Sequence, residues 1–143
     1  MIDSKEKLSV EDFKEMQNDF GSVYASNFLS VMLPFIDSAD SLNMIEMEVL
    51  QMMKQWDCNM SPDKVEPTVF ETWTYLLTEN LFKDELGDEI YRLLVDEQKF
   101  TSIALFNILN NKNSVWADNV STIEIESLSE MALQSYRKTI ERI

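Results

Sequence analysis

The chain has 143 residues, with 26 acidic and 12 basic side chains and no histidine, for a formal net charge of −14. Phosphate backbones and anionic lipid surfaces repel such a chain, so we exclude nucleic-acid and membrane-surface binding. The lack of histidine excludes Ser-His-Asp and Cys-His catalysis within the chain and zinc sites of the usual His/Cys kind, and the single cysteine, Cys58, excludes an intrachain disulfide.

The first predicted helix begins after Ser9, which forms a capping box with Asp12. Pro34 is expected to kink or end this helix near Leu33, because proline lacks the N–H that a helix interior needs. Between these limits apolar side chains recur at spacings of three and four, on one helical face: Phe13, Met16, Phe20, Tyr24, Phe28 and Val31.

A second helix is predicted with Asp40 or Ser41 as its N-cap, and the polar stretch 57–67 then breaks the pattern. Ser61 followed by Pro62 indicates the start of a third helix, and Pro67 suits the first turn of that helix. The apolar stripe of the second helix is Leu42, Ile45, Val49, Met52, Met53 and Trp56, and that of the third is Phe70, Trp73, Leu76, Leu77 and Leu81.

The two tryptophans that flank this break, Trp56 and Trp73, raise the choice between a ligand site and a corner between buried helices. Apolar stripes of this kind usually pack against one another. A large indole on each side of a corner also fixes the angle between two helices. We therefore predict that both tryptophans enter a shared core.

The second half of the chain predicts further helices. Asp84 or Asp88 starts a fourth helix, with Ile90, Leu93 and Leu94 on its inner face. A fifth helix carries Phe100, Ile103, Phe106, Ile108 and Leu109. In one alternative the fourth and fifth helices are continuous. Residues 110–122 are predicted to be a polar loop around a lone Trp116. Thr122 caps the last helix, whose stripe is Ile125, Leu128, Met131 or Ala132, Tyr136, Ile140 and Ile143.

These elements predict a single all-α domain over residues 1–143, with five to six helices in an irregular bundle and no sheet. Only two glycines and three prolines occur, too few for the many turns of an all-β protein. No run of 18 apolar residues is present, and the N-terminus lacks the apolar core of a signal peptide, so the localisation stays open.

No catalytic, cofactor-binding or metal-binding residue is predicted. Asp84, Glu85, Asp88 and Glu89 cluster at an expected helix start, where acids compensate the helix dipole on a solvated face. Residues 37–48 fail as a calcium loop, because alanine and leucine stand where a ligand and the turn glycine belong. Cys58 follows a helix C-terminus, the end that does not activate a thiolate, so we expect an inert cysteine.

The order of these features resembles the penicillin acylase family over roughly residues 10–140. The sequence matches several family features in chain order. They are a helix with an apolar-Gln-x-Asp pattern, a Ser shortly after it, an apolar-Leu-Pro step and a Leu-x-x-Trp-Asp motif in which Met replaces Leu. A later tryptophan and a Trp-x-Asp pair follow. The matching residues are Met16, Gln17, Asp19, Ser22, Met32, Leu33, Pro34, Met53, Gln55, Trp56, Asp57, Phe70, Glu71, Thr72, Trp73, Trp116 and Asp118.

The resemblance implies an amide hydrolase whose large chain attacks with its N-terminal Ser, using its own α-amine as base. This chain begins Met1-Ile2, and the family's oxyanion Asn, neighbouring Arg and Trp-x-Trp-Gly motif have no counterpart in it. No catalytic residue of the family maps onto the sequence. The apolar stripe running to Ile143 agrees with a chain that is cut before its next element, so we expect an internal fragment of a larger enzyme.

Two functions follow as hypotheses. The first is a helical structural segment of a penicillin acylase-like amide hydrolase, inactive alone, with the remainder of the parent acylase as its partner and no cofactor. The alternative is a free-standing acidic helical interaction module, an adaptor or a regulator. A fragment is expected to expose apolar helix faces, above all on the final helix, and to form homodimers through them.

Overall fold

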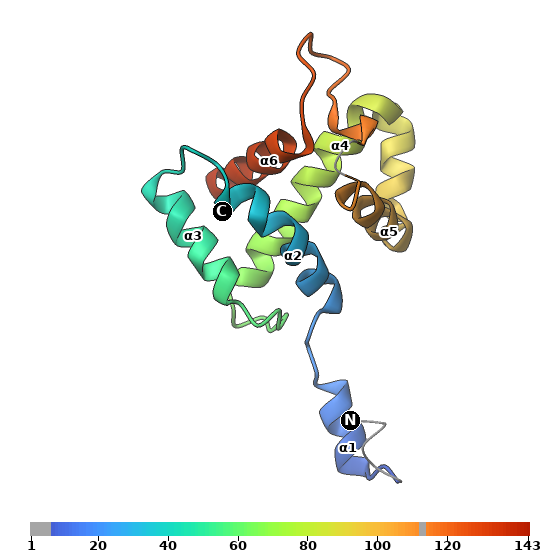
Figure 1. The fold of residues 1–143 in the computed structure, drawn as a ribbon. Helices are drawn as coiled ribbons and strands as arrows, with labels where there is room; N and C mark the ends of the chain where they lie inside the picture. Colours follow the sequence, from blue (N-terminus) through green and yellow to red (C-terminus); the bar gives the residue numbers. More distant parts are fainter. Residues whose placement is uncertain (1–6, 112–113) are drawn as a thin grey trace.

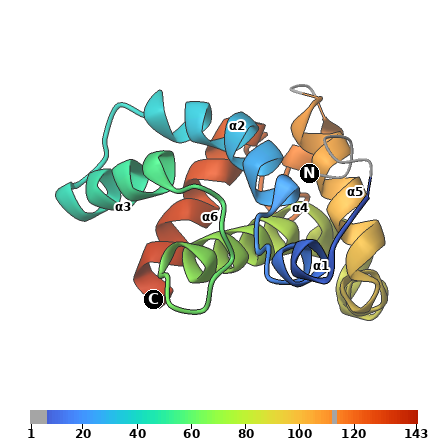
Figure 2. The same ribbon diagram turned by 90° about the horizontal axis from the view of Figure 1, so that it is seen from below.

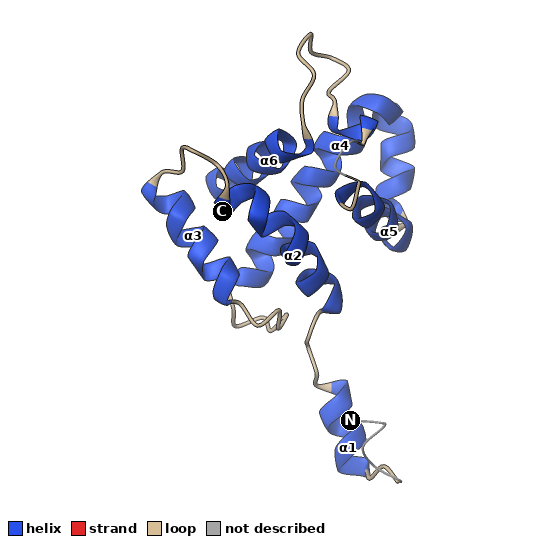
Figure 3. Cartoon of the chain, viewed as in Figure 1, coloured by secondary structure: helices blue, strands red, loops and turns tan. Residues whose placement is uncertain are grey.

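The computed structural model describes residues 7–111 and 114–143. Its elements are α1 (Val10–Gln17), α2 (Val23–Asp37), α3 (Met44–Gln55), α4 (Glu66–Asp96), α5 (Gln98–Leu109), the 3₁₀ turn Val115–Ala117 and α6 (Leu128–Arg142). The described residues form no strand, and their one isolated β-bridge joins Gly21 to Asn59 (Figure 3). The predicted all-α class with five to six helices is therefore confirmed.

The core lies among helices α2 to α6. α4 packs against α6 and α5, while α2 lies against α3, α5 and α6 (Figures 1 and 2). Figure 1 shows α1 standing away from the other helices, and α1 contributes no side chain to the hydrophobic core. The side chains predicted at the centre, Phe28, Met53, Phe70 and Trp73, are all buried.

Three helices begin with reciprocal capping boxes, at Ser9, Asn43 and Ser127. The box predicted at Ser9 and Asp12 is confirmed: Asp12 N–H donates to Ser9 Oγ at 3.2 Å, and Ser9 N–H donates to Asp12 Oδ2 at 2.7 Å. The predicted caps at Asp40 or Ser41 and at Thr122 are wrong, because each helix starts later in the chain.

The start of α3 is held by Asn43 and by contacts from α6. Asn43 Oδ1 accepts the Glu46 N–H at 3.0 Å, and Glu46 Oε2 accepts the Asn43 N–H at 2.9 Å. Arg137 in α6 then donates to Glu46 Oε1 at 3.1 Å and to the Ser41 carbonyl at 2.6 Å. Ser41 thus takes part in an inter-helix contact and not in the cap.

The last helix starts at Leu128, after a loop that Thr122 stabilises. The Thr122 hydroxyl is 3.0 Å from the Asn119 carbonyl, a local contact that competes with capping. Ser127 provides the cap instead, since its Oγ accepts the Glu130 N–H at 3.3 Å. Ile125, predicted as part of the helical stripe, consequently lies in the loop and is exposed.

The predicted single helix from residue 9 to Pro34 is wrong, because residues 18–22 separate α1 from α2. Asn18 Nδ2 donates to the Lys14 carbonyl at 2.9 Å, which satisfies the end of α1. Asp19 Oδ1 accepts the Gly21 N–H at 2.9 Å and turns the chain. The regular apolar spacing across this break therefore comes from two separate helices.

Pro34 neither ends α2 nor marks its boundary, since the helix continues to Asp37. Proline removes one backbone donor, and only the last turn of the helix follows it. The apolar face around it is retained, with Met32 and Ile36 completely buried. The predicted end near Leu33 is therefore wrong by one turn.

The third predicted helix begins later than expected. Ser61 and Pro62 belong to a turn, because the Ser61 N–H donates to Asn59 Oδ1 at 3.0 Å and Ser61 does not cap a helix. α4 begins at Glu66, and Pro67 occupies its first turn, as predicted.

α4 includes the fourth predicted helix, but its backbone breaks at Gly87 (φ 70°, ψ 166°), directly before Asp88. Of the two predicted starts, Asp88 thus follows a real interruption, whereas Asp84 lies inside the helix. A second boundary at Glu97 separates α4 from α5, so the alternative of one continuous helix is wrong. In Figure 1 the last part of α4 leaves the direction of its main part.

Trp116 is not a lone residue in a polar loop. It lies in the 3₁₀ turn, half-buried, and its ring packs on Phe82 with centroids 5.4 Å apart. Residues 112 and 113 of the predicted loop lie outside the described residues. Residues 1–6 also lie outside them, and they include part of the N-terminus for which no signal peptide was expected.

The expectation that the final helix presents a bare apolar face is wrong. Leu128, Ala132 and Tyr136 are buried, because α6 packs against α4, α2 and α3. Ile143, which belongs to the same expected face, is exposed. Other side chains predicted to face the core are exposed instead: Phe13, Phe20, Ile45, Ile90, Leu93, Phe100 and Ile103.

Candidate functional site

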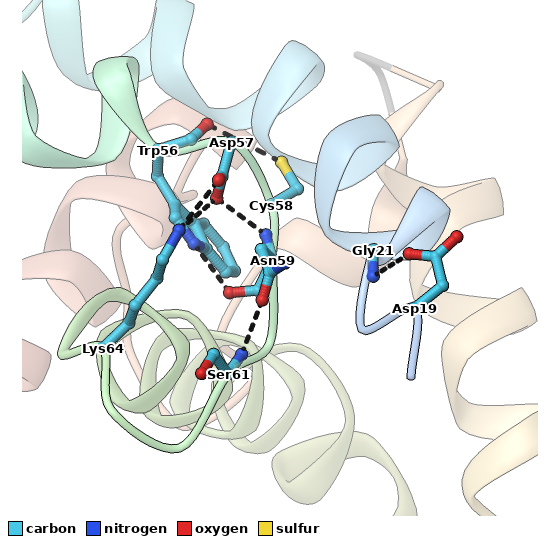
Figure 4. A network of polar contacts seen from close by, with 8 residues as sticks. All are labelled: Asp19, Gly21, Trp56, Asp57, Cys58, Asn59, Ser61 and Lys64. Carbon is cyan, nitrogen blue, oxygen red and sulfur yellow. Dashed lines mark hydrogen bonds and ion pairs between the residues drawn. The ribbon is translucent and has the colours of Figure 1, made fainter. Parts of the chain in front are cut away.

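Two segments that carry sequence motifs lie side by side in the structure. We call residues 18–22 the link and residues 56–64 the corner (Figure 4). The Ser22 N–H donates to the Cys58 carbonyl at 2.8 Å, and the Met60 N–H donates to the Phe20 carbonyl at 2.8 Å. These two bonds form the isolated antiparallel bridge centred on Gly21 and Asn59.

The link is shaped by the side chains of Asp19 and Ser22. Gly21 packs closely against Asp19: a Cβ at Gly21 would lie 3.0 Å from Asp19 Oδ1, the atom that accepts the Gly21 N–H, so the Asp19 side chain would have to shift by a few tenths of an ångström to admit one. Ser22 Oγ accepts the Ala25 N–H at 3.0 Å and so caps α2. Both motif side chains thus hold backbone, while Gln17 at the end of α1 is exposed.

The corner is closed by consecutive side-chain turns. Asp57 Oδ1 accepts the Asn59 N–H at 3.0 Å, and Asn59 Oδ1 accepts the Ser61 N–H at 3.0 Å. Lys64 Nζ donates to both oxygens of Asp57, at 2.7 and 2.8 Å. This hydrogen bond from Lys64 is the main cause that lowers the pKa of Asp57 below its ordinary value, with the Asn59 N–H as a further donor.

Trp56 joins the corner to the core. Its indole Nε1–H donates to the Asn59 carbonyl at 3.1 Å, while its ring packs on Phe70 with centroids 5.7 Å apart. Phe70 contacts Phe28 at 5.5 Å, and Phe28 meets Trp73 edge-on at 5.4 Å. The two tryptophans therefore enter one core, as predicted, and the phenylalanines connect them.

Cys58 has a strained backbone and an unreactive setting. It is the only non-glycine residue of the described chain with a positive φ, at 57°. Burial raises the pKa of its thiol, and the neighbouring Asp57 raises it further. Both effects disfavour the nucleophilic thiolate.

A separate recess of about 330 Å³ opens between α2, α4 and α5. The Tyr91 hydroxyl is buried at its wall without a hydrogen-bond partner among the described residues, and burial raises the pKa of Glu71. The recess is lined by Tyr24, Glu71, Thr74, Tyr75, Thr78, Tyr91, Val95, Thr101 and Ser102.

Three hydroxyls of this recess are engaged by the backbone of α4. Thr74, Thr78 and Thr101 each donate to a backbone carbonyl of α4, at 3.0, 2.6 and 2.5 Å, respectively. Of the residues that the structure describes, no lysine or arginine lines the recess. The protons of these three hydroxyls are thus bonded to backbone oxygens and not to a side-chain base.

The acidic cluster at 84–89 is largely solvated but makes two contacts, an ion pair of Asp88 with Lys83 at 3.7 Å and a hydrogen bond of Asp84. Glu85, Asp88 and Glu89 are exposed, whereas Asp84 Oδ2 accepts the Val120 N–H at 2.9 Å. In the described part of the chain, no group of three or more Asp, Glu or Cys side chains is placed to hold a metal ion. No helix described here is long and apolar enough to cross a bilayer.

The structure brings together some motif residues and leaves one pair elsewhere. Asp19, Ser22, Trp56 and Asp57 belong to the link and the corner, which Trp56 connects to the core. Trp116 and Asp118 have other partners: Trp116 packs on Phe82, and Asp118 Oδ1 accepts the Glu126 N–H at 3.3 Å.

Sequence reasoning missed the roles of Gly21, Asn59 and Lys64. The signal for Asn59 was present, because Asp or Asn two residues before a backbone N–H favours a side-chain turn. The pairing of Gly21 with Asn59 had no local signal, because the two residues lie far apart in the sequence.

The family model described as penicillin amidase matches residues 1–143, the whole chain. Comparison with curated proteins and with solved structures finds no match.

Proposed function

We propose, given that this chain belongs to the penicillin amidase family, that it is a helical structural segment of an acylase-like amide hydrolase. In this proposal the catalytic residues of acyl-amide hydrolysis lie outside the chain. Its partner is the remainder of the parent acylase, and its role is to support the catalytic part and help to shape the wall of the acyl pocket.

The link and corner contact carries this proposal. The polar motif residues Asp19, Ser22 and Asp57 all accept hydrogen bonds from backbone N–H groups, with Lys64 as a further donor to Asp57. A catalytic hydroxyl needs a base within reach and an oxyanion needs converging donors. The motif side chains are already engaged in holding the fold, which supports a structural role for the segment.

An amidase assay tests the proposal. The purified chain is incubated with phenylacetyl, glutaryl and long-chain acyl amides, and released amine is measured. We expect no turnover. Hydrolysis that persists through repurification and is abolished by Ser22→Ala would overturn the proposal, with Ser38→Ala, at the exposed C-cap of α2, as the matched control.

The alternative of a free-standing acidic interaction module is tested by the full coding sequence. If the gene product consists of these residues alone, the parent enzyme does not exist and the alternative replaces the proposal. If coding sequence for the remaining acylase elements is continuous with this segment, the module hypothesis fails.

A further inference from the structure

An apolar groove of about 460 Å³ lies where the second part of α4 meets the start of α5 and the 3₁₀ turn. Phe82 forms its floor, 4% exposed and packed on Trp116 with ring centroids 5.4 Å apart. The full lining is Phe82, Leu86, Ile90, Leu93, Leu94, Glu97, Phe100 and Trp116.

The rim of the groove exposes large apolar side chains. Ile90 is 55% exposed, Leu93 64% and Phe100 62%. Single exposed apolar residues need no explanation, but here three of them line one depression with a buried aromatic floor. Covering such a surface releases about 25 cal/mol for each Å² of apolar area removed from water.

The charge around this groove specifies its partner. Residues 82–100, which supply most of the groove lining, contain six acidic side chains and three basic ones, Lys83, Arg92 and Lys99. Of these acids only Asp88 has an ion-pair partner among the described residues, Lys83 at 3.7 Å. The groove is thus an apolar surface within a negative field, which attracts a cationic partner and repels an acidic one.

A second copy of the chain is a poor occupant on the same grounds. Each copy carries a net charge of −14, and an isologous contact would place the two acidic segments against each other. Like charges that face each other across an interface disfavour association strongly.

We propose that this groove receives an apolar segment flanked by lysine or arginine side chains, supplied by the remainder of the parent acylase. The choice of the parent as the source rests on the proposed function, whereas the chemistry of the segment rests on the groove itself. The apolar side chains of the segment cover Ile90, Leu93 and Phe100, and its basic flanks meet the acidic side chains around the groove.

The chemistry of the segment is tested with two synthetic helical peptides that share a leucine and phenylalanine stripe. One carries lysines beside the stripe and the other carries glutamates. Binding is followed through the indole N–H signals of the three tryptophans in the NMR spectrum, since Trp116 lines the groove while Trp56 and Trp73 lie in the core. Trp116→Phe assigns the signal.

We expect the lysine peptide to shift the Trp116 signal and the glutamate peptide to leave it unchanged. Leu93→Ser should weaken binding about tenfold, because it replaces an apolar side chain at the rim of the groove with a hydrated hydroxyl. Val65→Ser, an equally exposed apolar site at the other end of α4, should not weaken it. Equal binding of both peptides, no binding, or an unaffected Leu93→Ser variant would overturn the proposal.

The source of the segment is tested in the full gene product, with photoreactive benzoylphenylalanine in place of Leu93. We expect crosslinks to a basic, apolar segment outside residues 1–143. Crosslinks between two copies at residues 84–100 would overturn the proposal in favour of self-association. If the gene encodes no further residues, the proposed function fails, while the peptide experiment still decides the chemistry of the groove.

Discussion

The indole Nε1–H of Trp73 donates to Ser135 Oγ at 3.2 Å, which joins the N-terminal part of α4 to the centre of α6. Both residues are completely buried. The ring of Trp73 also packs on Tyr136, with centroids 5.1 Å apart, and the Tyr136 hydroxyl donates to the Glu46 carbonyl at 2.6 Å in α3. Trp73 and Tyr136 together therefore connect α4, α6 and α3.

Trp73→Ala should lower the free energy of unfolding by about 3–5 kcal/mol, as large core truncations do. Trp56→Ala should cost a similar amount, since its ring is also in the core. Urea denaturation measures both changes. Val65→Ala, exposed and near the start of α4, is the control; decreases below about 1 kcal/mol at both tryptophans would contradict the packing described for them.

Ser135→Ala should cost about 1–3 kcal/mol, because it leaves the buried Trp73 N–H without its acceptor. The cost should largely disappear in a Trp73→Phe background, where there is no donor to satisfy. A double-mutant cycle measured by denaturation gives this coupling directly. Additive effects would show that the hydrogen bond contributes nothing to stability.

Gly87→Ala should destabilise the fold by about 1–3 kcal/mol through backbone strain alone. The φ of 70° with ψ of 166° suits only glycine, yet a Cβ there would meet no atom within 4 Å. The Gly87→Ala substitution therefore tests backbone strain without adding a steric clash. An unchanged free energy of unfolding would mean that α4 straightens in the variant, which circular dichroism would report as added helix.

Glu71→Gln should stabilise the chain at neutral pH and lose this advantage in acid. Partial desolvation at the wall of the recess raises the pKa of Glu71 above its ordinary value of 4.5, although the residue as a whole is exposed, so the folded state binds the proton more tightly than the unfolded state. The ionised wild-type carboxylate therefore lowers the free energy of unfolding once the pH rises through the pKa of Glu71 in the folded state. Below the pKa of Glu71 in the unfolded state it has no such effect, because the group is protonated in both states.

The measurement is urea denaturation of both proteins at pH 7 and at a pH below the ordinary value. Glu85→Gln removes the same charge from a site on α4 that does not line the recess and serves as the control. An equal gain for both variants at pH 7 would assign the effect to net charge and not to the burial of Glu71.

Apolar spacing and capping chemistry predicted the helical class and the core positions of Phe28, Met53, Phe70 and Trp73, because these signals are local. Helix boundaries were harder to predict wherever a side chain can form hydrogen bonds either as a helix cap or within a turn. Thr122 and Ser61 both have cap chemistry, but Thr122 bonds within its loop and the Ser61 N–H bonds to Asn59. Which partner wins depends on the surrounding fold, and a single sequence does not contain that information in local form.

The candidate site shows the same division. Asp57 and Trp56 stood out as motif residues, while the contact that gives them a role requires Gly21 to lie against Asn59. Ile90 and Leu93, both exposed, follow the break in α4 at Gly87. Glycine marks such a position in the sequence, but only the tertiary fold shows which way the chain turns there.

The bridge between Gly21 and Asn59 has a consequence for the dynamics of the chain. It brings the two ends of the segment that contains α2 and α3 together, so that this segment is a closed loop within the fold. Opening such a loop breaks the bonds of Ser22 N–H and Met60 N–H in a single event. In deuterated solvent these two amides should therefore exchange at one common rate, and that rate reports how often this loop opens at its base.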